Sequence, residues 1–160
     1  MTRPLLVDTH SHLTDPRFLG DFPAVVDRAR QAGLVGAMVV GTTAANSRGC
    51  IDLCAGQDWL FPTVGMHPCH LQDEPFEASW REVEEMAALP EVRALGETGL
   101  DNYWKEVPME LQREGLRRHL ELGRRLGKPV ILHCREAAEQ LLEMVEEAAK
   151  AGPVAGVLHS

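Results

Sequence analysis

The amino-acid sequence predicts an α/β fold built on a parallel sheet. Along its 160 residues, short apolar segments of strand length alternate with longer segments whose apolar residues recur at helical spacing. Such alternation produces right-handed strand–helix–strand crossovers and therefore parallel strands. Polar clusters follow five of the expected strands at their carboxyl ends. This favours a TIM barrel over an open sheet, because in a barrel these ends converge on one mouth.

Six strands are expected, each an apolar segment that ends near a glycine or a polar cluster. The first is expected to be buried. Pro62 weakens the assignment of the third, since proline cannot donate a hydrogen bond to the neighbouring strand. The predicted fold is therefore a TIM-type barrel truncated to about six strands with their helices. These strands cover residues 5–9, 36–40, 60–64, 92–95, 129–132 and 154–158.

The expected helices lie between these strands and carry recognisable ends. Asp21 is a candidate N-cap for the first helix, which Gly33 terminates. Ser79 and Glu82 form a capping-box pattern for the third helix, which ends before Pro90. The helices are expected over residues 23–32, 44–54, 79–88, 109–126 and 137–151.

Composition indicates a globular protein, with 44% hydrophobic and 25% charged residues. The net charge is −8 at pH 7 and the sequence has no block of lysine and arginine. A nucleic-acid substrate would therefore need a local basic patch or bound cations. Neither a membrane-spanning run nor a signal peptide is recognisable, so a cytoplasmic location without a membrane partner is expected. The four cysteines lack a CxxC spacing, and reduced thiols are expected.

The candidate site begins with His10 and His12. Side chains alternate faces along a strand, so these two imidazoles point to the same side and can hold a metal ion. Glu97, His133 and His159 stand at or just beyond the ends of later strands. Nitrogen and oxygen donors from several strands suit Zn²⁺, Mn²⁺ or similar divalent ions, and Glu97 could bridge two of them. The residues alone therefore predict a metal-dependent hydrolase.

Several ordered motifs resemble the successive signatures of the TatD family. They are residues 8–12, 65–68, 96–101, 132–137 and 158–160, together with Gln112 and the helix that carries His119 and Leu120. The ordered set spans nearly the whole chain and is specific, whereas the His-x-His pair alone is shared by many amidohydrolase-like enzymes.

The resemblance implies a metal-dependent deoxyribonuclease on a TIM barrel, with one or two divalent ions (Zn, Mn or Mg). It implies that His10, His12 and Glu97 bind one ion, and that Glu97, His133 and His159 bind or approach a second. A metal-activated water would then attack the scissile phosphorus of a DNA substrate, single-stranded or at a 3′ end.

The resemblance also implies roles for the residues around the metals. His67 and Arg135 stand where substrate phosphate is expected, so Glu97, His67 and Arg135 form the predicted catalytic set. Asp101 is expected to support the shell around Glu97. The roles of His67 and Arg135 each have an alternative. His67 could pack in a turn before Pro68, and Arg135 could serve as an ion-pair partner at the mouth.

Other residues are expected to be structural. His70 and His119 are predicted to be structural or exposed. Trp59, Trp80 and Trp104 are predicted to pack, although Trp104 could line the mouth because it follows a site motif.

The chain departs from the family in length, since a typical barrel has roughly 250 residues. Residues 1–160 are therefore expected to be a single hydrolase domain, the N-terminal two-thirds of a complete barrel. It would lack the aspartate that the family places after a late strand, which would weaken metal binding and catalysis. Two other functions stay open: a metal-dependent amidohydrolase or esterase, such as an aminoacyl deacylase, and a non-catalytic remnant. The oligomeric state is not predicted.

Overall fold

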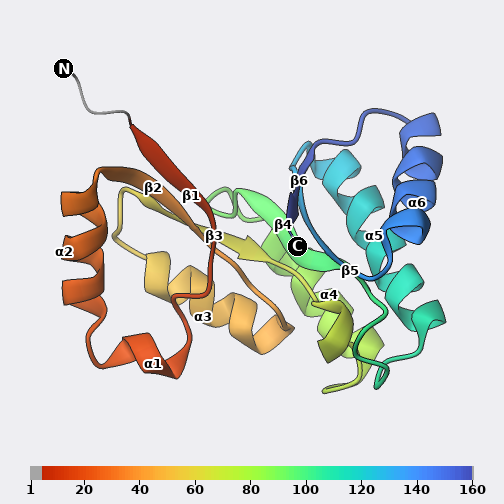
Figure 1. Ribbon diagram of the computed structural model, residues 1–160, viewed down its shortest axis with the longest axis horizontal. Helices are drawn as coiled ribbons and strands as arrows, with labels where there is room; N and C mark the ends of the chain where they lie inside the picture. Colours follow the sequence, from red (N-terminus) through yellow and green to blue (C-terminus); the bar gives the residue numbers. More distant parts are fainter. Residues whose placement is uncertain (1–4, 160) are drawn as a thin grey trace.

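The computed structural model describes residues 5–159 (Figure 1). Six parallel strands form one sheet in the order β1-β2-β3-β4-β5-β6, as a barrel requires. The strands are β1 (Leu6–Ser11), β2 (Leu34–Val39), β3 (Leu60–Val64), β4 (Ala94–Asp101), β5 (Val130–Arg135) and β6 (Gly156–His159). The helices are α1 (Pro16–Leu19), α2 (Phe22–Ala32), α3 (Ala44–Cys54), α4 (Phe76–Ala87), α5 (Met109–Leu126) and α6 (Ala138–Lys150), with the 3₁₀ turn η1 (Pro68–His70).

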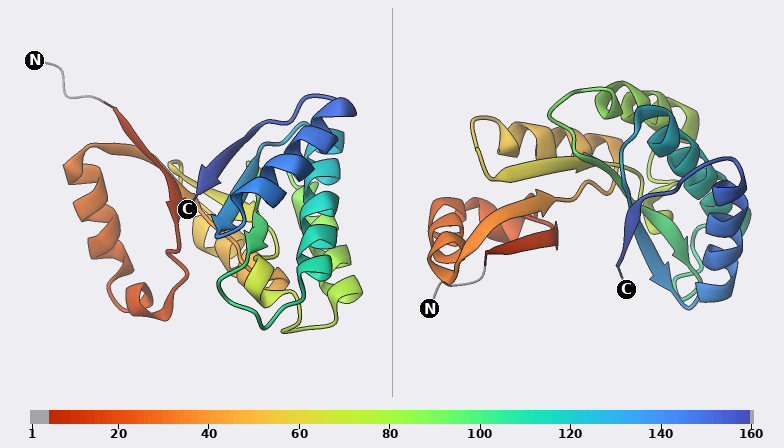
Figure 2. Two further views of the ribbon diagram at one scale, coloured as in Figure 1. Left: turned by 45° about the vertical axis from the view of Figure 1, so that its right-hand side comes forward. Right: turned by 90° about the horizontal axis from the view of Figure 1, so that it is seen from above.

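The sheet curves, and the helices lie on its outer side (Figure 2). This curvature brings the ends of β1 and β6 towards each other, although the two strands do not pair in the described sheet. The rings of His10 and His159 stack there with their centroids 3.7 Å apart. The fold is therefore a partial TIM barrel of six strands, as predicted.

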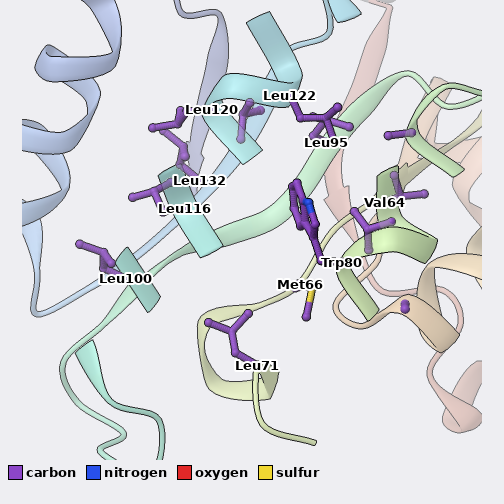
Figure 3. Packing of buried hydrophobic residues seen from close by; sticks show 14 of the residues in the cluster. Val64, Met66, Leu71, Trp80, Leu95, Leu100, Leu116, Leu120, Leu122 and Leu132 are labelled. Atoms are coloured by element: carbon purple, nitrogen blue, oxygen red, sulfur yellow. The ribbon is translucent and has the colours of Figure 1, made fainter. Parts of the chain in front are cut away.

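The main core lies between the second half of the sheet and its helices. Figure 3 shows leucines of α5 packed with leucines of β4 and β5, and Trp80 of α4 closes the same cluster. A second cluster lies between β2, α2 and α3 and includes Val39, Cys50 and Trp59. These cores fix the strand ends that carry the polar site.

The predicted capping box of Ser79 and Glu82 is wrong, whereas Asp21 is the N-cap residue of α2, as predicted. Helix α4 begins at Phe76, with Pro75 at its N-cap. Ser79 therefore lies inside the helix, where its hydroxyl donates to Glu74 at 3.1 Å. Proline favours this earlier start, because its fixed φ angle fits a helix beginning. The Asp21 side chain makes no capping bond and instead pairs with Arg28 at 3.1 Å.

The predicted burial of the first strand is also wrong. Leu6 and Val7 are 46% and 58% exposed, because β1 is an edge strand with β2 as its only neighbour in the described sheet. Strand β4 runs six residues beyond its predicted end, to Asp101. Ser160, which was expected to close the last motif, lies outside the described residues. No helix within residues 5–159 is both long and apolar enough to cross a membrane.

Candidate metal centre

Glu97 lies at the centre of the polar site. It sits in β4, a strand in which every residue is buried, and its side chain is only 3% exposed. Its Oε2 lies 3.3 Å from Nε2 of His10 and 3.7 Å from Nε2 of His12. The two imidazole nitrogens are themselves 3.1 Å apart. Three donor atoms, two from the end of β1 and one from the middle of β4, therefore converge on one point.

These separations fit a bound divalent ion. Ligand atoms about 2.1 Å from one ion lie about 3.0 Å apart at right angles and about 3.4 Å apart at tetrahedral angles. Imidazole nitrogen and carboxylate oxygen are also the donors that Zn²⁺ and Mn²⁺ accept. The donor atoms and their spacing therefore suit the divalent metal ion that the sequence predicted.

His159 joins this side of Glu97 from the end of β6. Donor atoms of His10, Glu97 and His159 all lie within 4.8 Å of one another. The sequence grouped His159 with His133, but those two rings are 6.4 Å apart, whereas His159 stacks on His10. In the described structure, His159 therefore lies with His10 and Glu97, two of the residues predicted for the first ion.

The other oxygen of Glu97 faces His133 of β5. Nδ1 of His133 lies 3.1 Å from Oε1 of Glu97, and Nε2 lies 3.0 Å from Oδ2 of Asp101. A carboxylate on the far nitrogen of a histidine fixes its tautomer and turns the near nitrogen towards a metal. Asp101 therefore contacts His133 and positions its ring, whereas the sequence analysis expected Asp101 to support the residues around Glu97.

His67 completes a second group on this side. Its Nε2 lies 3.9 Å from Oε1 of Glu97, and donor atoms of His67, Glu97 and His133 lie within 4.8 Å of one another. Its Nδ1, however, accepts a hydrogen bond from the backbone N–H of Cys69 at 3.1 Å. A neutral imidazole that accepts at Nδ1 carries its proton on Nε2. His67 therefore presents a donor, and not a lone pair, to the centre.

Electrostatics agree with these assignments. Burial lowers the pKa of His67 to about 4, so its ring is neutral at pH 7. Burial alone would raise the pKa of Glu97, but hydrogen bonds with His10 and His133 hold it well below its ordinary value. Burial opposes the charge of His133, yet the bonds to Glu97 and Asp101 raise its pKa. Glu97 is therefore an anion between histidines on both sides.

Arg135 and Asp8 lie outside the ligand groups. Arg135 is exposed at the end of β5, and its guanidinium carbon lies 3.8 Å above the ring of Tyr103. The carboxylate of Asp8 accepts from the backbone N–H of His10 at 3.0 Å, so it positions the start of the His-x-His pair. Tyr103 was not expected near the site. The signal was an aromatic pair, Tyr103 and Trp104, directly after a site motif.

Comparison with known proteins agrees with this geometry. A family model described as "TatD related DNase" matches residues 7–160. An uncharacterized metal-dependent hydrolase of Bacillus subtilis, YabD, is 31% identical over 157 residues, which cover 97% of this chain and 60% of YabD. The 3'-5' ssDNA/RNA exonuclease TatD of Edwardsiella piscicida is 37% identical over 141 residues, covering 88% of this chain and 54% of that protein.

The fold has matching solved structures. The crystal structure of YJJV, a TatD homologue from Escherichia coli, aligns with a TM-score of 0.83 at 31% identity, over 89% of this chain and 55% of YJJV. A TatD-family hydrolase from Entamoeba histolytica aligns with a TM-score of 0.84 at 24% identity, which supports the fold alone. The chain thus spans little more than half the length of these relatives. Since the family model matches almost all of its residues, this chain belongs to the TatD family of metal-dependent hydrolases.

Proposed function

We propose that this protein is a metal-dependent deoxyribonuclease that hydrolyses phosphodiester bonds of single-stranded DNA or DNA 3′ ends. The observation that carries the proposal is the position of Glu97. One buried carboxylate faces His10 with one oxygen and His133 of β5 with the other, and His159 of β6 joins the group that contains His10. Such a shared carboxylate suits two neighbouring cations, an arrangement that recurs in enzymes acting on phosphate esters. The relative named as an ssDNA/RNA exonuclease supports the same substrate class.

Five side chains would hold one or two ions of Zn, Mn or Mg: His10, His12, Glu97, His133 and His159. When bound, such ions supply Lewis acidity, which makes water a better nucleophile and offsets the charge of a phosphate. The ligand residues contribute burial and fixed orientation. Asp101 contributes by holding the His133 tautomer.

His67 and Arg135 supply hydrogen bonds and charge for the substrate. Nε2–H of His67 is a neutral donor aimed at the centre, which favours a phosphate oxygen over a metal as its partner. Arg135 offers a permanent cation with forked N–H donors, a geometry that matches phosphate. The two groups therefore provide the local attraction that a chain with net charge −8 lacks overall.

Cleavage of a labelled single-stranded oligonucleotide with Mn²⁺ or Mg²⁺ tests the proposal. We expect activity that EDTA abolishes and that Glu97→Gln reduces more than about 100-fold. Loss of a supporting carboxylate beyond the ligands already costs 10–100-fold in such sites. Gln keeps the size of Glu but cannot carry the shared negative charge. Glu143→Gln, on the exposed side of α6, is the matched control and should retain full activity.

Two outcomes would contradict the proposal. Cleavage that persists after EDTA treatment and in Glu97→Gln would exclude the metal centre as its origin. Metal-dependent hydrolysis of carboxylic esters or aminoacyl esters, without cleavage of DNA or RNA, would instead favour the esterase alternative.

A further inference from the structure

Tyr103 and Trp104 form an exposed aromatic pair directly after β4. They are 47% and 49% exposed, whereas Trp59 and Trp80 are 5% and 6% exposed and lie in the cores. Trp59 and Trp80 therefore pack as predicted, whereas Trp104 is exposed, in keeping with the predicted alternative that it lines the mouth. The two rings meet edge to face with centroids 4.9 Å apart. Large aromatic surfaces left in water at a site mouth commonly mark a binding surface.

This pair is tied directly to the metal centre. One oxygen of Asp101 accepts the backbone N–H groups of Tyr103 and Trp104 at 2.9 and 2.8 Å. The other oxygen lies 3.0 Å from Nε2 of His133. A single carboxylate thus positions both the aromatic pair and the histidine next to Glu97. A ligand on these rings would extend towards the centre.

Arg135 adds a cation to the same surface. Its guanidinium stacks over Tyr103 at 3.8 Å and lies 5.7 Å from the Trp104 ring. The ion pairs at this end of β5, among residues 5–159, join His133 to Glu97 and Asp101 and do not include Arg135, so its charge is available to a ligand. Arg135 lies closer to the Tyr103 ring than to the Trp104 ring, and the Trp104 side chain is 49% exposed, so it is accessible to a ligand. The surface therefore combines an exposed tryptophan ring with an exposed positive charge.

We propose that Trp104 stacks on an unpaired nucleobase while Arg135 binds a phosphate of the same strand. Tyr103 contacts both groups and so supports their positions. Stacking needs a base whose face is free, so the surface would select single-stranded over duplex nucleic acid. The inference rests on the proposed nuclease function and adds the part of the substrate that is recognised beside the scissile phosphate.

Equilibrium binding in the presence of EDTA tests this without turnover. The probes are a fluorescently labelled single-stranded oligothymidylate and an abasic oligomer of the same length and charge. We expect the base-containing strand to bind more tightly, and Trp104→Ala to weaken that strand alone by about tenfold or more. Trp104→Phe should retain most of the preference, because it keeps an aromatic face. Leu142→Ala on the exposed side of α6 should behave as the wild type.

The intrinsic tryptophan fluorescence offers a second readout. Only Trp104 of the three tryptophans is exposed, so the oligothymidylate should quench a component that Trp104→Phe lacks. The inference is overturned if the wild type binds both strands equally, or if Trp104→Ala weakens both equally. Neither result depends on cleavage, so failure of the stacking surface is distinguishable from failure of the nuclease proposal.

Discussion

At the scale of single residues, one hydrogen bond decides what each imidazole presents to the centre. Asp101 binds the far nitrogen of His133 and leaves the near one facing Glu97. The Cys69 N–H binds His67 at Nδ1 and leaves a donor facing inwards. His-x-His spacing was readable in the sequence, but these tautomers were not, because they depend on partners in other strands or in a turn.

Replacement of Asp101 by Asn is predicted to separate its contact with His133 from its contacts with the backbone of Tyr103 and Trp104. Asn keeps a carbonyl oxygen for the N–H groups of Tyr103 and Trp104, but its amide nitrogen cannot accept from His133. We expect metal affinity to fall about 10- to 100-fold, measured by calorimetry with Mn²⁺. Oligonucleotide binding in EDTA should change little.

The surface pair of Asp73 and His70 provides the control for this prediction. It has the same chemistry, with 2.8 Å between the carboxylate oxygen and Nδ1, but it is exposed, and neither residue belongs to the two groups of candidate ligands. Asp73→Asn should leave metal affinity unchanged. An equal loss in both variants would exclude the proposed role of Asp101.

His119 predicts a pH dependence of stability. It is fully buried between Met66, Thr98 and Gly115, and burial lowers its pKa from 6.5 to about 4. Between these two pH values the unfolded chain binds more protons at this position, so the free energy of unfolding falls as pH falls. Urea unfolding at pH 7.5 and pH 5 should show a smaller pH effect in His119→Gln than in the wild type. His70→Gln, at an exposed position, should not reduce it.

At the scale of elements, β4 is the strand whose length could not be read locally. Helices α3 and α5 and strand β3 have the predicted bounds, because their signals are local: periodic apolar residues with glycine or proline at the ends. Residues 96–101 contain two glycines and two acids, which are poor strand formers. Pairing with β5 nevertheless keeps this segment extended. Tertiary context therefore overrides propensity where the site is built.

Gly99 permits the close approach of β4 and β5. Its φ is +148°, and a Cβ built there would collide with the carbonyl oxygen of His133. Gly99→Ala is therefore predicted to destabilise the fold by about 3 kcal/mol, through backbone strain and overpacking. Gly20→Ala, where a Cβ meets nothing within 4 Å, should be nearly neutral. Urea titration of both variants measures the difference, and equal midpoints would contradict the expectation.

At the scale of the whole molecule, topology made the position of the site predictable. Parallel strands in sequential order bring their carboxyl ends to one mouth, so His10, Glu97, His133 and His159 could be expected together from sequence alone. Which of these histidines lie together on the same side of Glu97 could not be predicted, because that depends on how far the sheet curves. That curvature sets His159 beside His10 and leaves the two edge strands with exposed apolar side chains.

The exposed edges predict self-association. Val157 and Leu158 of β6 are 43% and 61% exposed, and within residues 5–159 β6 pairs with β5 alone. Apolar edges of this kind invite strand pairing between copies. Sedimentation velocity over a concentration series should show mass above the 17.7 kDa of one chain. Val157→Lys combined with Leu158→Lys should shift the distribution towards monomer. Leu142→Lys, on a helix, should not, and equal shifts in both would rule out the strand edge as the cause.

The contact between His10 and His159 joins the first strand to the last. Bringing together two rings this far apart in the sequence requires closure of a very long loop. Such contacts form late in folding, because the chain loses conformational entropy on loop closure before the contact itself contributes any stabilisation. A folding intermediate could therefore hold His10 and His12 in place without the third imidazole. Metal uptake would then report completion of the sheet, and a Co²⁺ absorption signal followed during refolding should appear after the helical signal is complete.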